Sequence, residues 1–154
     1  MNEKHQENLK NAIKNLQIAD HMTYVTFPLV KDKRLFLKIF DNIYKAIIEC
    51  INAILNYEFL YKRIKIYSNL NKNIETFIDK CAKKYFLTNG QIKKIKKIIL
   101  INKQHKQSAI EFVRQDKIII MSDSLGIQTL TLQEIKEYLL LAKELLMNTK
   151  NKIK

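Results

Sequence analysis

The sequence predicts an all-α fold, a compact bundle of about five helices with a small β-hairpin near the C-terminus. Apolar residues recur three and four positions apart over most of the 154 residues, which is the period of an amphipathic helix. Helix breakers are scarce, since the chain holds two glycines and one proline. Two short apolar runs joined by a polar turn, the pattern of a hairpin, occur only between residues 118 and 130. A chain of this length can bury a core without disulfides or metals, so we expect residues 1–154 to form a single helical domain.

The first helix is expected from about Glu3 to His21. Its buried stripe consists of Leu9, Ala12, Ile13, Leu16 and Ala19. Residues Thr23–Leu29 are expected to form an extended connection, because Pro28 lacks an amide donor and disfavours helix at Phe27 before it. Asp32 is then expected to cap the next helix.

The second helix is expected to be the central member of the bundle. Neither glycine nor proline interrupts the chain from Lys33 to about Ile66, and apolar residues there cover more than one face, which is typical of a helix surrounded by others. The apolar positions are Leu35, Leu37, Ile39, Phe40, Ile43, Tyr44, Ile47, Ile48, Ile51, Ile54, Leu55, Phe59 and Leu60. The strip left to water is expected to hold Asp41, Lys45, Glu49, Asn52 and Asn56.

Two further helices follow a polar break at Ser68–Asn73. The apolar stripe of the third helix consists of Ile74, Phe77, Ile78, Cys81, Tyr85 and Phe86. Thr88, three residues before Gln91, forms a capping box that begins the fourth helix. In that helix Ile92, Ile95 and Ile99 face the core, and Lys93, Lys94, Lys96, Lys97 and Lys103 fan over the exposed side.

The C-terminal third is expected to hold the hairpin and the last helix. Ser108, three residues before Glu111, predicts a single helical turn through Phe112 and Val113. The strands of the hairpin are expected at Ile118–Met121 and Ile127–Leu130, on either side of the polar turn Ser122–Gly126. Thr131 and Glu134 form the clearest capping box and open the last helix, and the tail after Asn148 is expected to fray. The buried positions of that helix are Leu132, Ile135, Leu139, Ala142 and Leu146.

The positive charge is concentrated in one third of the chain. The net charge is +13, and between Phe59 and Ile110 thirteen lysines and arginines meet only Glu75 and Asp79. The 25 lysines, 24 isoleucines and 14 asparagines fit an A+T-rich genome, but codon drift would not remove every acid from Lys80 to Ile110. A one-signed field of this kind favours polyanions, namely nucleic acid, anionic lipid or an acidic protein face. The residues expected to contact nucleic acid are Lys62, Arg63, Lys65, Lys83, Lys84, Lys93, Lys94, Lys97, Lys103 and Lys106.

The residue types in the basic window limit what such contacts could recognise. Lysine dominates and Arg63 is the only arginine there, whereas base recognition and bidentate phosphate contacts favour arginine. We therefore expect contact with a nucleic-acid backbone without sequence preference. Nearby aromatic residues could stack on unpaired bases or pack in the core with their hydroxyls at the rim, and the sequence leaves both readings open. They are Tyr57, Tyr61, Tyr67 and Tyr85.

The sequence holds no legible catalytic, metal or cofactor motif. The three histidines and two cysteines lack the paired spacing of a zinc site, and with two glycines there is no phosphate-binding loop. Cys50 and Cys81 are expected to be buried thiols rather than a disulfide, which fits a reducing, cytoplasmic compartment. The first ten residues lack the apolar stretch of a secretory signal, and no apolar run reaches the ~20 residues of a membrane span. We expect no enzyme activity, catalytic residue, cofactor or metal.

Three stretches carry a resemblance to other proteins. Most of the chain resembles a group of small archaeal helical proteins. The resemblance lies in the segment Ala19–Asp32 (ADHMTYVTFPLVKD), in the helix through Asn42, Ala46 and Asn56-Tyr57-Glu58, and in the run Glu111–Asp116 (EFVRQD) with the hairpin and terminal helix that follow it. The helical pattern is also similar to HEPN domains, many of which are RNases that use an arginine followed by four to six residues and a histidine. Neither Arg34, Arg63 nor Arg114 has a histidine in that range. The archaeal resemblance implies no known activity. If the fold is HEPN-like, the nuclease chemistry is absent, and binding or oligomerisation is the function that remains.

Three functions remain open from the sequence. The first is a non-catalytic protein that binds RNA or ribonucleoprotein through the lysine-rich face. The second is an interaction module, either a homodimer or a subunit whose basic face meets an acidic protein. The third is an enzyme with an unrecognised site. A large exposed apolar patch would favour the second function over the first.

Overall fold

The computed structural model describes residues 3–107, 110–123 and 126–153, and within them helices predominate. In chain order the elements are α1 (Lys4–His21), the π-helical turn η1 (Met22–Thr26), α2 (Phe27–Val30), α3 (Leu35–Leu60), α4 (Leu70–Thr76), the π-helical turn η2 (Phe77–Cys81), α5 (Asn89–Gln107), β1 (Ile110–Arg114), β2 (Lys117–Ser122), β3 (Gly126–Thr131) and α6 (Leu132–Lys152). The helix-dominated fold class predicted from the sequence is confirmed. The predicted hairpin is part of a three-stranded antiparallel sheet.

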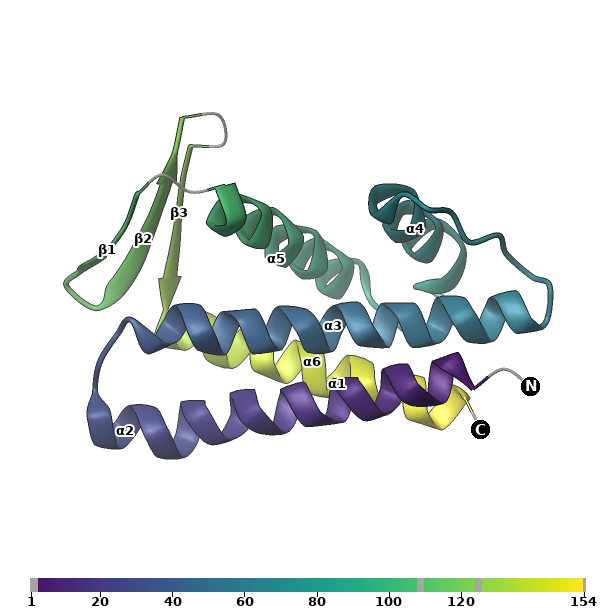
Figure 1. Cartoon of the computed structure of the whole chain (residues 1–154), viewed down its shortest axis with the longest axis horizontal. Helices are drawn as coiled ribbons and strands as arrows, with labels where there is room; N and C mark the ends of the chain where they lie inside the picture. The colour runs from purple at the N-terminus through teal and green to yellow at the C-terminus, as the bar shows by residue number, and fades with distance from the viewer. Residues whose placement is uncertain (1–2, 108–109, 124–125, 154) are drawn as a thin grey trace.

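The core forms around α3, the predicted central helix. α1 runs alongside α3 and α6 lies behind them, whereas α4, α5 and the sheet lie on the opposite side of α3 from α1 (Figure 1). Helices on both sides explain why α3 is apolar on more than one face. Ile47 and Ile51 are fully buried at its middle, as the sequence predicts. α3 begins at Leu35 and ends at Leu60, so it is shorter than the expected span from Lys33 to Ile66.

The polar strip of α3 does not simply face water, as was expected. Glu49 and Asn56 are half-buried and point toward α1. The side-chain amide of Asn8 donates to Glu49 Oε1 at 2.7 Å, and that of Asn56 donates to Asn8 Oδ1 at 2.8 Å. The expectation was wrong for these two residues because asparagines on α1 supply partners that the period of α3 alone does not reveal.

The expected extended connection at Thr23–Leu29 is also wrong, since the chain stays helical there. A widened π-helical turn, η1, leads into α2, and Pro28 occupies the first turn of α2. Proline is tolerated in a first turn, and π turns accommodate a lost backbone bond. α2 ends at Val30, and the capping residue Lys31 adopts a left-handed φ of 58° and donates its amide to Phe27 O at 2.7 Å. Asp32 then accepts the amide of Arg34 before α3 begins.

The predicted third helix is divided. α4 ends at Thr76 and continues as η2, and the stripe residues Phe77, Cys81 and Tyr85 are buried as expected. Phe86 is an exception, because its backbone is left-handed (φ 67°) and 70% of the residue is exposed. The turn that ends the segment rotates this side chain out of the stripe.

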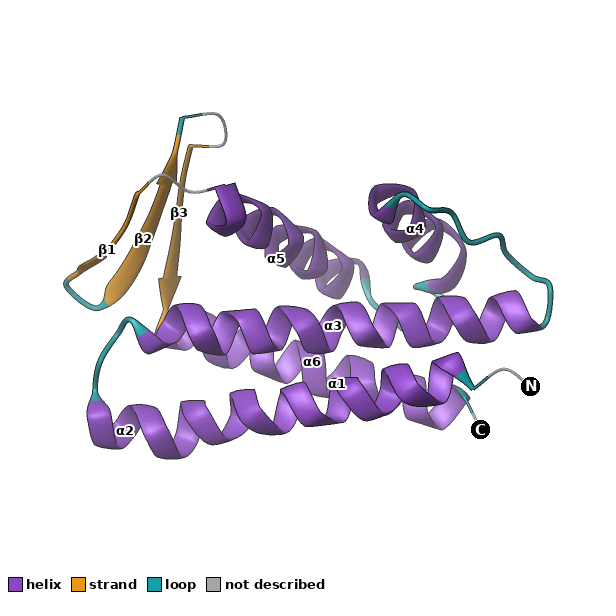
Figure 2. Ribbon diagram, viewed as in Figure 1, coloured by secondary structure: helices purple, strands orange, loops and turns teal. Residues whose placement is uncertain are grey.

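The sheet contains one strand that the sequence analysis missed. The sheet has three strands, β1, β2 and β3 in order (orange in Figure 2), where a helical turn and a hairpin were expected. β1 covers the segment predicted as helical and pairs antiparallel with β2, so Phe112 lies opposite Ile119. Ser108, the proposed cap of that turn, lies outside the described residues. β2 and β3 pair as the predicted hairpin, with Ile118 opposite Leu130; two residues of its turn, 124 and 125, are not described.

The capping box that opens α6 is confirmed, since the Thr131 hydroxyl accepts the amide of Glu134 and the Glu134 carboxylate accepts the amide of Thr131. The expected fraying after Asn148 is wrong. α6 continues to Lys152, Thr149 is buried, and Ile153 packs into the core. Among the described residues no helix is both long and apolar enough to cross a membrane.

The two cysteines are free and buried, as predicted. Burial raises the pKa of the Cys50 thiol to about 12, and burial is also the main cause that raises the pKa of Cys81 to about 11. Both thiols are therefore protonated at neutral pH and behave as small apolar side chains.

Candidate nucleic-acid interface

The segment that follows α3 reverses direction at once. Lys62 adopts a left-handed φ of 60°, which is uncommon for a residue with a side chain. Its amide donates to Phe59 O at 2.9 Å, and the amide of Arg63 donates to Glu58 O at 3.0 Å. These bonds satisfy carbonyls that would otherwise be unpaired at the helix end. The reversal brings residues 61–67, here called the basic loop, beside η2.

Glu58 anchors the start of the basic loop. Its side chain is only 2% exposed, so an unpaired charge there would be strongly unfavourable. The carboxylate accepts hydrogen bonds from Lys84 Nζ at 2.7 Å and from the phenol of Tyr85 at 2.8 Å. The guanidinium of Arg63 lies 3.3 Å from the same group. This Glu58 cluster (Glu58, Arg63, Lys84 and Tyr85) joins the end of α3 to the segment that precedes α5.

The cluster holds Glu58 in its charged form. Burial alone would raise the pKa of this carboxyl, but the hydrogen bonds from Lys84 and Tyr85, with the charges of Lys84 and Arg63, outweigh burial and lower it. The pKa of Tyr85 is raised, first by burial and then by its bond to Glu58, so its phenol remains a donor. Lys84 and Arg63 thus share one buried negative charge. That charge partly cancels the attraction that the two cations exert on an anionic ligand.

Asparagines of the predicted polar break fix the other end of the basic loop. The side chain of Asn73 accepts the amide of Tyr67 and donates to its carbonyl, both at 2.8 Å. Asn69 caps α4 by accepting the amide of Lys72 at 3.2 Å. Tyr67 is therefore held on both its backbone groups although the loop has no regular secondary structure.

A shallow hollow opens between the basic loop and η2. Four cationic side chains line it, together with Ile64, Tyr67 and Thr76, and its volume is about 350 Å³. The cations are Lys62, Arg63, Lys65 and Lys80. Lys80 was not among the predicted contact residues, because helical spacing alone did not show that η2 would face the loop.

The sequence left open whether four tyrosines pack in the core or are free to stack on bases, and the structure shows that they differ in exposure. Tyr85 is buried in the Glu58 cluster, and Tyr57 packs edge-on against His5 and Tyr61. Tyr61 and Tyr67 are 54% and 43% exposed. A cation lies near each exposed ring, with Arg63 4.9 Å from the centroid of Tyr61 and Lys72 5.5 Å from that of Tyr67. Two of the four rings therefore remain accessible to a ligand, one of them at the hollow.

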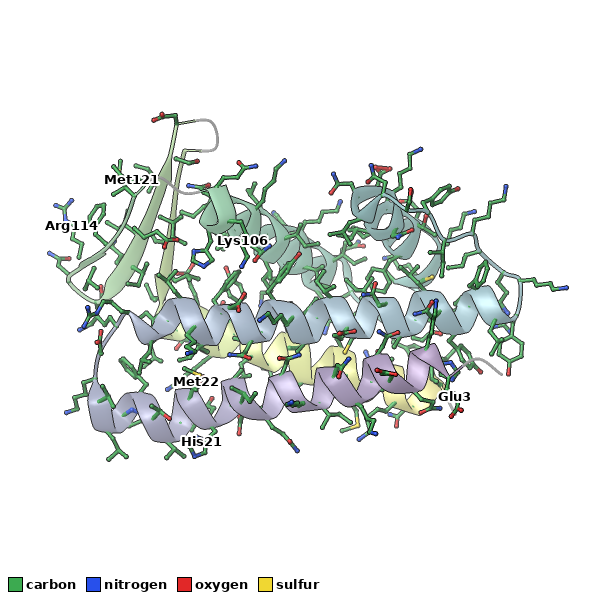
Figure 3. The ribbon with its side chains drawn as sticks, viewed as in Figure 1. Glu3, His21, Met22, Lys106, Arg114 and Met121 are labelled. Atoms are coloured by element: carbon green, nitrogen blue, oxygen red, sulfur yellow. The ribbon has the colours of Figure 1, made fainter. Side chains whose placement is uncertain are left out.

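The other predicted contact residues lie on α5 and on the turn before it, and Figure 3 labels Lys106 at the C-terminal end of α5. Lys83 Nζ donates a hydrogen bond to Asn89 Oδ1 at 2.7 Å. Lys106 reaches toward Asp41 on α3 at 3.8 Å. The exposed lysines on α5 include Lys93, Lys94, Lys97 and Lys103.

The ten predicted residues do not form one compact site. The structure brings Lys62, Arg63 and Lys65 together at the hollow, and it ties Arg63 and Lys84 to Glu58. The α5 lysines form a separate row on the same side of α3 (Figure 1). An extended polyanion could contact both groups, because the chain from Lys80 to Ile110 contains neither Asp nor Glu.

Within residues 3–107, 110–123 and 126–153 no group of three or more potential ligands is placed to hold a metal. His105 Nδ1 contacts the carboxylate of Glu111, a pair that the sequence did not suggest. The pair is half-buried and joins α5 to β1, so it holds the first strand against the end of α5.

No protein-family model, curated protein or solved structure matches the chain. The HEPN-like and archaeal resemblance therefore stays a prediction.

Proposed function

We propose that this protein binds RNA through backbone phosphates, using the hollow at the basic loop and the lysine row of α5, and that it catalyses no reaction. The observation that carries the proposal is the hollow itself. Four cations from two segments surround one depression, and neither Asp nor Glu lines it. A polyanion gains most where several cations act on it together.

The accessible ring of Tyr67 at the same hollow favours single-stranded RNA. Asn73 fixes the backbone of Tyr67, so a base that stacks on the ring does not have to order a mobile loop, and the entropic cost of binding is lower. Stacking of a base on an aromatic ring contributes about 1–3 kcal/mol and tolerates any base. Binding of unpaired nucleotides without sequence preference follows.

Fluorescence anisotropy with a single-stranded RNA of about 20 nucleotides tests this proposal. Changing Lys62, Lys65 and Lys80 to Gln should weaken binding several-fold. The matched control changes Lys10, Lys14 and Lys150 to Gln, which removes equal charge from exposed positions on α1 and α6. Equal loss in both triple variants would mean that only net charge matters, and would contradict a site at the hollow.

A Tyr67→Leu variant tests the preference for single strands. Loss of stacking should weaken single-stranded RNA about tenfold, and a duplex of the same sequence should bind as before. Retention of an acidic protein with no RNA binding at about physiological salt would instead favour the interaction module, since a phosphate surface should still bind at roughly 10⁻⁴ to 10⁻⁶ M.

A further inference from the structure

The three-stranded sheet packs only one of its faces on the helices. Ile118, Ile120 and Leu130 point to that face and are buried. From α5, the buried side chain of Gln104 donates to the carbonyls of Ile120 at 2.9 Å and Gly126 at 2.6 Å. Side chains alternate along a strand, so the residues between these positions point the other way.

The opposite face of the sheet is apolar. The strand register places Ile110, Met121 and Ile127 in one row across the three strands, and Phe112 and Ile119 in the next. Ile110, Phe112 and Ile127 are exposed, and Ile127 is 60% exposed. In Figure 3, Met121 and Arg114 lie on the side of the sheet away from α5. These five apolar residues are here called the outer sheet face; Ile119 is only 8% exposed, so the apolar surface offered to a partner comes mainly from Ile110, Phe112 and Ile127.

Charge points to the kind of partner that this face accepts. Residues 110–131 hold two basic and three acidic side chains, so the sheet is nearly neutral in a chain of net charge +13. Two copies of the chain would repel one another through the basic loop and α5, where the positive charge is concentrated, and not through this sheet. An acidic partner would instead be drawn to the basic loop and α5.

The ends of the outer sheet face carry opposite charge. Arg114 and Lys117 lie opposite each other at one end, which stays positive although Asp116 in the turn between them offsets one charge, and Asp123 lies beyond the other end of β2. If two copies pack with their strands running in opposite directions, the basic end of each meets the acidic end of the other. The face is therefore complementary to itself, as a two-fold interface requires.

We propose that a second copy of this chain packs its outer sheet face against the first, so that two sheets lie face to face in a homodimer. Sheets in such packing lie about 10 Å apart with their apolar side chains interdigitated. Phe112, Met121 and Ile127 would lie at the centre, and the paired charges at the rim. This association does not depend on the proposed binding of RNA.

Light scattering coupled to size-exclusion chromatography tests the proposal on nuclease-treated protein, over about 1 to 200 µM because a dimer responds to concentration. The wild type should be a dimer and Ile127→Lys a monomer. Leu140→Lys is the matched control, since Leu140 is a 56% exposed leucine on α6 and its change should leave the dimer intact. Circular dichroism confirms that both variants are folded.

The charged rim gives a second test that a general loss of solubility would not mimic. Arg114→Glu should weaken the dimer, and adding Asp123→Lys should restore it. A wild type that stays monomeric throughout, a dimer that survives Ile127→Lys, or a wild type that instead captures a different protein through Ile127 would overturn the proposal. Failure of the double variant to restore association would overturn the antiparallel arrangement.

Discussion

The phenol of Tyr85 donates a 2.8 Å hydrogen bond to the carboxylate of Glu58, a residue that is 27 positions earlier in the chain and almost completely buried. Lys84 binds the other oxygen of the same carboxylate. Through this contact the end of α3 is tied to the segment between η2 and α5. The position of the basic loop relative to η2, and with it the hollow, depends on that tie.

Replacing Glu58 with Gln should lower the free energy of unfolding by about 1–3 kcal/mol, because Lys84 and Arg63 lose the anion that they share while both remain partly exposed to water. Chemical denaturation measures the change. Glu75→Gln on the exposed side of α4 is the control and should stay within about 0.5 kcal/mol of wild type. Equal stability of the two variants would show that the Glu58 cluster does not hold the fold together.

The contribution of Glu58 should depend on pH in a definite direction. Its pKa in the folded protein is lowered from the usual value of 4.5, so the stabilisation is fully present above that value and is lost as the pH falls through the folded pKa. Denaturation of wild type and Glu58→Gln at pH values of about 7 and about 3 measures it. The difference in unfolding free energy between them should shrink at the lower pH. A difference that grows on acidification would mean that folding raises the pKa of Glu58 instead of lowering it.

Ile47→Asp and Ile51→Asp should each cost several kcal/mol, because either change places an unpaired charge at the middle of α3. Little soluble, folded protein is expected from either. Leu29→Asp at the exposed end of α2 is the control and should melt like the wild type. Wild-type melting of both α3 variants would mean that the core lies elsewhere.

The elements that the sequence predicted well are those determined by near neighbours. The capping boxes of Thr88 with Gln91 and Thr131 with Glu134 join residues three positions apart, and both form as expected. The spacing of the apolar residues along α3 indicates directly which of its side chains are buried. These features need no knowledge of distant partners.

Features that depend on distant partners were missed. Lys84 and Tyr85, which bind the Glu58 carboxylate most closely, are 26 and 27 positions away, so an ordinary helical glutamate gave no sign that it would be buried. β1 is only five residues long, and its residues suit either a helical turn or a strand until β2 pairs with them. The exposure of Phe86 follows from a left-handed backbone that its position in an apolar stripe does not reveal.

The dependence of RNA affinity on salt tests the central claim most directly. Affinity for single-stranded RNA should be measured from about 0.05 to 0.5 M salt for the wild type and for a variant with Lys93, Lys94 and Lys97 changed to Gln. If these lysines contact phosphates, log affinity falls linearly with log salt, and the triple variant reduces the slope by up to about two or three contacts. Absence of binding at physiological salt, or binding that is indifferent to all three lysines, would contradict a phosphate-binding surface on α5.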